Sequence, residues 1–254
     1  MTAAIAAPSE TDRMPRMPWA AHLREARTRG IRAGLALAVA AVLGFVFADP
    51  IMDVLRAPIE AVAQTRDASL NYDSVTGAFD LRMKVALFAG IALSSPVWLY
   101  ELLAFLTPGL TRRERRYTLG FFAAALPLFA AGCATGFVLF PHMVELLTGF
   151  AATEDSTILQ AATYLDFVMK IVLATGVAFV LPVVLVMLNL LGMLPAATLL
   201  RGWRYIVVAI VVFSALVTPA ADALSMFLVA VPMSALFGAA IAIAWLHDRR
   251  RTVA

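Results

Sequence analysis

Two short segments of the sequence each place a single glutamate among several arginines. The first is H-L-R-E-A-R-T-R-G, residues 22–30, and the second is L-T-P-G-L-T-R-R-E-R-R-Y, residues 106–117. The two acids are Glu25 and Glu114. Carboxylates and guanidinium groups form planar, charge-assisted pairs of hydrogen bonds. Because both segments border long apolar runs, what they can bind depends on the side of a membrane that they face.

Other chemistry has little support in the residue pattern. The three histidines, His22, His142 and His247, are far apart in the sequence, and there is no H-E-x-x-H motif. Cys133 is the single cysteine of the sequence. We therefore expect no metal, no cofactor and no disulfide. The run Ser94-Ser95-Pro96 indicates a kinked helix rather than a nucleophile, because no base is expected at the same depth. The pattern predicts that the protein is not an enzyme.

Composition indicates a membrane protein. The chain has 254 residues, of which 62% are hydrophobic and 15% are charged, and its mean hydropathy is +0.86. Soluble domains are usually about 45–50% apolar. Residues 1–30 are polar and rich in arginine, without the short apolar core of a cleavable signal peptide. We expect a polytopic membrane protein.

Six runs are apolar and long enough to predict spanning helices. Period-two alternation is absent, which favours an all-α membrane protein over a barrel. Residues 1–30 then form an N-terminal segment, residues 31–246 the transmembrane domain and residues 247–254 a C-terminal tail. The predicted spans are Ile31–Ala48, Leu81–Leu106, Leu119–Phe140, Leu165–Leu194, Trp203–Val217 and Ala223–Leu246.

The arginines predict the orientation of these helices. With six spans, nearly all of them fall on one side, whereas the opposite loops hold Arg56 and Arg66 and many acids. Basic residues in short loops mark the cytoplasmic side, so both termini are expected in the cytoplasm. The arginines concerned are Arg13, Arg16, Arg24, Arg27, Arg29, Arg32, Arg112, Arg113, Arg115, Arg116, Arg201, Arg204, Arg249, Arg250 and Arg251.

The outer loops are predicted to contain short amphipathic helices. Apolar residues recur at helical spacing from residue 51 to 62, after Pro50, and more weakly from Pro141 to Leu159. The fifth span is short, since about 15 residues cover only some 22 Å of a core of about 30 Å. Two explanations stay open. Either the helix continues past Pro219, or the bilayer is thinner around the last two spans.

Charged residues near the spans are expected to form structural pairs. Asp80 and Lys84 are four residues apart, as are Asp166 and Lys170, so each pair can meet on one helix face. Glu101 lies near the cytoplasmic end of the second span, where it could reach the headgroup zone.

In these motifs and in its pattern of spans, the sequence resembles the TatC family of the twin-arginine protein translocase. The resemblance covers nearly the whole chain, and its longest motif, S-x-P-x-x-L-Y-x-x-x-x-F-x-x-P-G-L-x-x-x-E-R-R, runs from Ser94 to Arg116. Further matches are H-L-x-E-x-R-x-R (residues 22–29), Ala57-Pro58, Y-L-x-F-V (164–168), G-V-x-F-x-x-P-V (176–183) and T-P…D…S-M…P-M (218–233).

The resemblance implies a receptor and translocation core for folded proteins, driven by the proton-motive force. Its partners would be TatA and TatB, or a single TatA-like protein, together with twin-arginine signal peptides, membrane lipids and further copies of the chain; nucleic acid is not expected. Glu25 and Glu114 would accept the signal arginines. The other implied signal-peptide residues are Leu23, Arg27, Phe105 and Pro108, and the implied partner or structural residues are Pro58, Asp222, Met226 and Pro232.

The chain departs from the family pattern at four positions. Glu101 stands where the family commonly has Gln, and Leu103 where it has Trp. Val180 replaces a buried Glu of the fourth span, and Gly238 replaces a polar residue of the sixth. We expect Asn189 to supply some of the missing polarity.

Two other functions are compatible with a six-helix membrane protein. A small-molecule transporter or channel would need polar residues converging at mid-membrane, or interrupted helices in matched halves. A purely structural scaffold would need neither. Crosslinking of signal peptides to the chain distinguishes all three.

Overall fold

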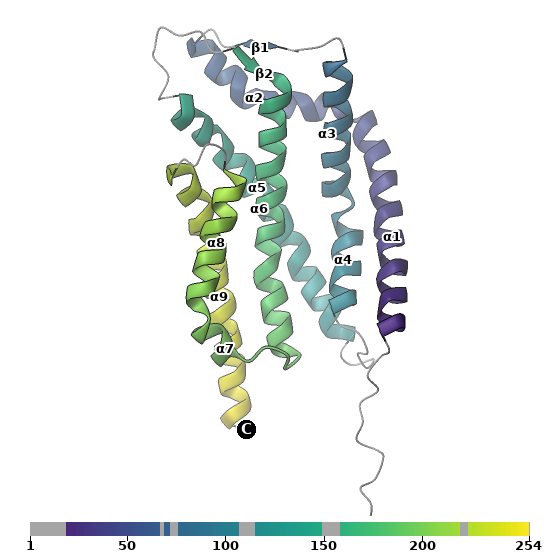
Figure 1. Ribbon diagram of the computed structural model, residues 1–254, viewed down its shortest axis with the longest axis vertical. Helices are drawn as coiled ribbons and strands as arrows, with labels where there is room; N and C mark the ends of the chain where they lie inside the picture. The colour runs from purple at the N-terminus through teal and green to yellow at the C-terminus, as the bar shows by residue number, and fades with distance from the viewer. Residues whose placement is uncertain are drawn as a thin grey trace, which may run out of the picture.

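The structure, a computed structural model, describes residues 19–66, 69–71, 76–106, 115–148, 158–218 and 223–253. These residues form nine helices and two short strands (Figure 1). The helices are α1 (Trp19–Val46), α2 (Ala48–Arg66), α3 (Gly77–Leu93), α4 (Ser95–Leu106), α5 (Arg115–Thr148), α6 (Ala161–Leu190), α7 (Ala196–Arg201), α8 (Trp203–Val217) and α9 (Ala223–Val253). The strands are β1 (Ser69–Asn71) and β2 (Ile158–Gln160).

The helices make the six membrane crossings that the sequence predicts. Within the described residues, α1, α5, α6 and α9 are each long and apolar enough to span a membrane, α3 and α4 together form a bent span, and α8 is a shorter apolar helix. The first and last helices are longer than predicted. Residues 19–30 are continuous with the first span in α1, and α9 continues through the predicted tail to Val253.

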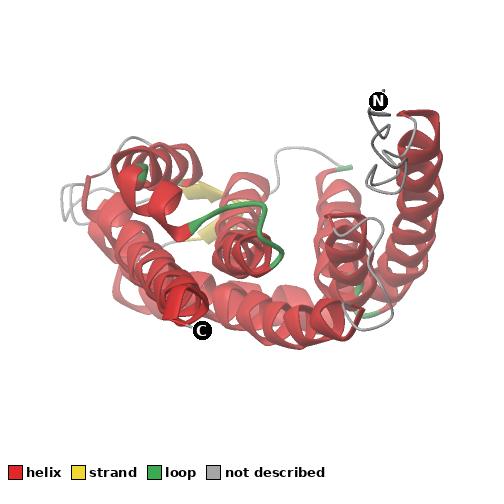
Figure 2. Ribbon diagram, turned by 90° about the horizontal axis from the view of Figure 1, so that it is seen from below, coloured by secondary structure: helices red, strands yellow, loops and turns green. Residues whose placement is uncertain are grey.

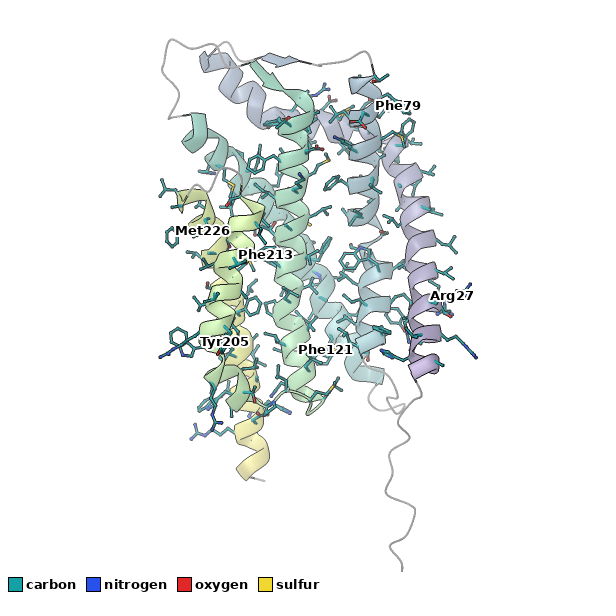
Figure 3. All side chains as sticks on the ribbon, in the orientation of Figure 1. Arg27, Phe79, Phe121, Tyr205, Phe213 and Met226 are labelled. Carbon is teal, nitrogen blue, oxygen red and sulfur yellow. The ribbon has the colours of Figure 1, made fainter. Side chains whose placement is uncertain are left out.

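Both ends of the described chain lie at the same end of the bundle (Figure 1). The start of α1, the short helix α7 and the end of α9 are found there, whereas α2 and the two strands lie at the opposite end. Seen along the bundle, α1, α3–α4, α5 and α8–α9 follow a curved line, with α6 on its inner side (Figure 2). Arg27 and Phe79 lie toward the two opposite ends (Figure 3).

Small residues bring α1 and α3 close together. A Cβ atom added to Gly44 would lie 2.6 Å from the carbonyl oxygen of Ala86, and one added to Gly90 would lie 2.8 Å from the backbone of Ala41. Apolar helices in lipid gain little from hydrophobic burial against one another, so close backbone approach of this kind contributes strongly to their packing. The α1–α3 contact therefore fixes the first helix beside the bent span.

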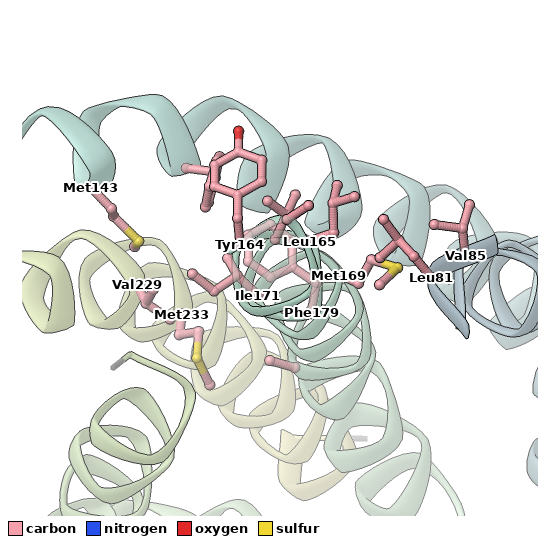
Figure 4. Packing of buried hydrophobic residues seen from close by; sticks show 14 of the residues in the cluster. Leu81, Val85, Met143, Tyr164, Leu165, Met169, Ile171, Phe179, Val229 and Met233 are labelled. Atoms are coloured by element: carbon pink, nitrogen blue, oxygen red, sulfur yellow. The ribbon is translucent and has the colours of Figure 1, made fainter. Parts of the chain in front are cut away.

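The largest buried cluster joins α3, α5, α6 and α9 (Figure 4). Among its fully buried members are Leu81 of α3, Met143 of α5, Leu165 of α6 and Val229 of α9. Because α6 contributes the most residues to this cluster, it is the central helix against which the other spans pack.

The second span is kinked where Ser94-Ser95-Pro96 predicts it. The axes of α3 and α4 differ by 54°. Pro96 has no backbone N–H, so it cannot continue the helical hydrogen-bond pattern. The indole Nε1 of Trp98 donates to the carbonyl oxygen of Ile91 at 2.9 Å, which satisfies one of the acceptors near the kink.

The first predicted amphipathic helix is α2. Ile51, Met52 and Leu55 pack against the core, whereas Asp53 and Val54 are exposed, and Pro50 lies in the first turn. The second predicted helix is not separate, because α5 continues through Pro141 to Thr148. The strands were not predicted; they pair in parallel, with Ser69 opposite Ile158.

Helix α8 is short, as the sequence predicts. It has 15 residues, compared with 34 in α5. The explanation that it continues past Pro219 is wrong, because it ends at Val217 and Thr218 has an extended backbone with ψ of 131°.

One of the two predicted ion pairs is wrong. Lys84 Nζ lies 3.4 Å from Asp80 Oδ2, as expected, but it also lies 3.0 Å from Asp166 Oδ2. Asp166 therefore pairs across helices with Lys84 rather than along α6 with Lys170. Intrahelical spacing alone missed this, because the partner is 82 residues away in sequence.

Candidate functional site: a charged cluster between α1 and α4

A stripe of polar residues on α1 faces a matching stripe on α4. His22, Glu25 and Arg29 are spaced i, i+3 and i+7 and so share one face of α1, and Glu101 and Phe105 are spaced i, i+4 on α4. The two helices run in opposite directions (Figure 1). The first residue of one stripe therefore meets the last residue of the other.

Arg29 is the centre of the cluster. Its Nε and Nη2 donate to Oε1 of Glu25 at 2.9 and 2.8 Å, and its Nη1 donates to Oε2 of Glu101 at 2.8 Å. One guanidinium thus joins carboxylates from two helices. The planar fork of arginine suits this geometry, whereas the compact ammonium of lysine cannot reproduce it.

Glu101 is the most buried member of the cluster. Its side chain is 9% exposed, compared with 26% for Glu25 and 23% for Arg29. Arg32 Nη1 lies 3.6 Å from Glu101 Oε1. A buried carboxylate needs cationic or hydrogen-bonding partners, and Arg29 and Arg32 provide them for Glu101.

An aromatic contact lies beside the cluster, toward the first residue of α1 and the last residue of α4. The rings of His22 and Phe105 are stacked, with centroids 4.6 Å apart and an angle of 24° between the planes. This contact and the Arg29 bridge connect the start of α1 to the end of α4 at two levels. Both contacts join residues that lie far apart in the sequence.

The structure brings together two of the six residues expected to bind signal peptides. Glu25 and Phe105 lie in the cluster. Leu23 is 66% exposed, and Arg27 is exposed and points away from the bundle (Figure 3). Glu114 and Pro108 lie outside the described residues. The helix that follows them, α5, packs against α4, as does α1.

The expected partner or structural residues are spread over two helices. Pro58 lies within α2. Met226 and Pro232 lie in α9, and both are half-buried. Asp222 is outside the described residues.

Two positions at which the family pattern has a polar residue inside the membrane are occupied here by Val180 and Gly238. Val180 is buried among Leu99, Leu103 and Phe129, and Gly238 is exposed on α9. The expectation that Asn189 supplies the missing polarity is wrong, because Asn189 lies at the last turn of α6. There its Nδ2 donates to the carbonyl oxygen of Leu194 at 2.9 Å and to Asp248 Oδ1 at 3.2 Å.

Sequence reasoning missed the roles of Glu101 and Arg29. The sequence pattern links Arg29 to membrane orientation and Glu101 to the headgroup zone. The signal was present in the spacing, since each residue shares a helix face with a motif residue, namely Glu25 or Phe105. What the sequence lacks is the antiparallel register of α1 and α4, which alone places these two side chains together.

These features define the class of the protein: a multi-pass helical membrane protein with a carboxylate–arginine cluster at the end of the bundle that carries both ends of the described chain. Residues 21–232 match the family model of the Sec-independent protein translocase protein, TatC. The chain belongs to the TatC family, and it is a subunit of the Sec-independent, twin-arginine protein translocase.

Similar proteins cover almost the whole chain. The TatC protein of Xylanimonas cellulosilytica is 45% identical over 94% of this chain and 87% of its own length. That of Rothia mucilaginosa is 38% identical over 93% and 82%. A crystal structure of the twin-arginine translocase receptor TatC has 29% identity and a TM-score of 0.77, covering 89% of this chain and 98% of that one.

Proposed function

We propose that the chain binds the twin-arginine signal peptides of folded cargo at the end of the bundle that holds the α1–α4 cluster. With TatA- and TatB-type partners, or with one protein serving both roles, it would export that cargo at the expense of the proton-motive force. The receptor complex would contain more than one copy of the chain. The observation that supports this is the Arg29 bridge, since it is a site that already accommodates one guanidinium between two carboxylates.

We propose that this end of the bundle lies on the cytoplasmic side of the cell membrane. The start of α1, α7 and the end of α9 lie there (Figure 1), and these elements carry Arg24, Arg27, Arg201 and Arg249. Basic residues next to spans are retained on the cytoplasmic side. A cytosolic signal peptide would therefore reach the cluster without crossing the membrane.

Glu25 and Glu114 are proposed as the acceptors for the signal arginines. Charge-assisted hydrogen bonds are worth about 1.5–3 kcal/mol each, so removal of one acceptor should weaken binding by roughly 10- to 100-fold. If Glu114 instead only pairs with a neighbouring arginine in its own loop, that exposed pair contributes at most about 1 kcal/mol and has no influence on cargo.

The test compares signal peptides bearing paired arginines with otherwise identical peptides bearing paired lysines. Glu25→Gln and Glu114→Gln should each abolish the preference for arginine while membrane insertion and abundance stay unchanged. Asp53→Asn, an exposed change in α2 at the opposite end, is the matched control. An unchanged preference in both glutamine variants would contradict the assignment.

A further inference from the structure

We propose that Arg29 is a resident competitor for the signal-peptide acceptor Glu25, and that Glu101 is the carboxylate that keeps Arg29 paired when a signal arginine displaces it from Glu25. Arg29 and Glu101 would then be determinants of specificity rather than supports for the fold. This inference rests on the proposed function, because it assumes that Glu25 receives the signal peptide.

Among the described residues, the hydrogen bonds to Glu25 use only one of its two oxygens. Both Arg29 atoms that reach Glu25 donate to the same oxygen, Oε1. Oε2 accepts no hydrogen bond from the residues that the structure describes, and the side chain is 26% exposed. An incoming guanidinium can therefore contact Oε2 first. A full bidentate pair needs both oxygens, so it forms only when Arg29 releases Oε1.

Glu101 makes that release possible. Arg29 Nη1 is already 2.8 Å from Glu101 Oε2, so Arg29 can leave Glu25 without becoming an unpaired charge in a part-buried site. Without this second carboxylate, release would leave the guanidinium without a charged partner, which is strongly unfavourable. The nearly buried position of Glu101 also keeps it out of reach of the cargo, so that it stays available to Arg29.

The exchange favours arginine over lysine. The resident group is itself a guanidinium, and an incoming side chain must match its two parallel hydrogen bonds in order to displace it. A lysine ammonium is a point charge without this planar fork, so it competes poorly for Oε1. Removal of Arg29 should accordingly increase affinity for both kinds of peptide and reduce the difference between them.

The experiment measures binding of twin-arginine and twin-lysine signal peptides to the full-length protein in lipid nanodiscs. For Arg29→Gln we expect about tenfold tighter binding of the twin-arginine peptide and a larger gain for the twin-lysine peptide. For Glu101→Gln we expect about tenfold weaker twin-arginine binding, because Arg29 then stays on Glu25. Arg24→Gln removes an exposed positive charge from the same end of α1 and should leave the preference for arginine unchanged.

A supporting role for Arg29 predicts the opposite sign. If Arg29 only holds α1 against α4, Arg29→Gln weakens or leaves unchanged the binding of both peptides, and that result would overturn the inference. The double variant Arg29→Gln/Glu101→Gln keeps the net charge of the cluster and protects the test against loss of folding. It should bind the twin-arginine peptide more tightly than Glu101→Gln alone; equal or weaker binding would also overturn the inference.

Glu25→Gln, measured in parallel, separates this inference from the proposed function. If Glu25→Gln does not weaken binding, then Glu25 is not an acceptor and the proposed site is wrong. If Glu25→Gln weakens binding but Arg29→Gln does not tighten it, the proposed site stands and the competitor role of Arg29 alone is wrong.

Discussion

Lys84 of α3 and Asp166 of α6 form an ion pair, with Nζ and Oδ2 3.0 Å apart. Both residues lie in the first half of helices that begin at the end of the bundle opposite the start of α1 (Figure 1). Asp80 lies 3.4 Å from the same ammonium, but its side chain is twice as exposed as that of Asp166. The pair joins the bent span to the central helix. Two charged contacts therefore connect helices that are far apart in sequence.

Asp166→Asn should lower the thermal stability of the protein in detergent. The pair is about one-third exposed, so solvent screening limits the expected loss to about 1 kcal/mol. Asp80→Asn is the matched control. It removes the other carboxylate charge beside the Lys84 ammonium without disconnecting α3 from α6. Equal melting temperatures for the Asp166→Asn variant and the unmodified protein would show that the interhelical pair contributes nothing.

A second prediction concerns the start of α7. Asp248 of α9 accepts a hydrogen bond from the backbone N–H of Ala196 at 2.7 Å, and α7 begins at Ala196 after Pro195. The first N–H groups of a helix have no partner within it, so this carboxylate acts as a cap supplied by another helix. Asp248→Ala should lower the stability of α7 by about 1 kcal/mol, the usual effect of removing a helix cap.

Hydrogen exchange of residues 196–201 measures the effect of the cap. Exchange should accelerate in Asp248→Ala and much less in Asp248→Asn, because the asparagine oxygen can still accept the Ala196 N–H. Exchange within α5 is the internal reference. If both variants exchange at the same rate as the unmodified protein, the cap does not stabilise α7.

The orientation of the bundle is tested with single cysteines. After Cys133→Ala, one cysteine replaces Asp53, exposed in α2, and another replaces Met193, which is 67% exposed in the turn after α6. A membrane-impermeant maleimide should label position 53 from outside intact cells and position 193 only in inverted vesicles. Labelling of both positions from one side would be incompatible with six crossings.

Much of the fold could be predicted from composition and helix periodicity, because hydrocarbon leaves the backbone few alternatives to the helix. The six crossings, the kink at Ser94-Ser95-Pro96 and the amphipathic helix after Pro50 all depend on local sequence. The β1–β2 pairing and the Lys84–Asp166 contact depend on residues that are distant in the chain. No local pattern encodes them.

The candidate site divides in the same way. Glu25 and Phe105 could be named because they belong to motifs of the family. Arg29 and Glu101 could not be paired from the sequence, because their contact needs the antiparallel register of α1 and α4 and a separation of 72 residues. For Asn189 the sequence predicts a polar group in the membrane interior, but its amide lies near the end of α6.

The short helix α8 gives the last prediction, which concerns the bilayer. Its 15 residues extend about 22 Å, whereas the hydrocarbon core is about 30 Å thick. A helix too short for the core can be accommodated by local thinning of the bilayer. Tyr205 and Leu216, each 81% exposed, lie near the two ends of α8 and about 17 Å apart along its axis.

Spin labels at these two positions report how deep they lie. If the bilayer thins around α8, both labels should collide with a polar relaxation agent as often as labels at Leu119 and Val138. Those two exposed positions of α5 are about 28 Å apart along a helix of full length and serve as the control. If the bilayer keeps its ordinary thickness, at least one of the α8 labels must lie several ångströms inside the hydrocarbon. Low accessibility at Tyr205 or Leu216, with normal values at the α5 positions, would therefore show that α8 does not thin the membrane.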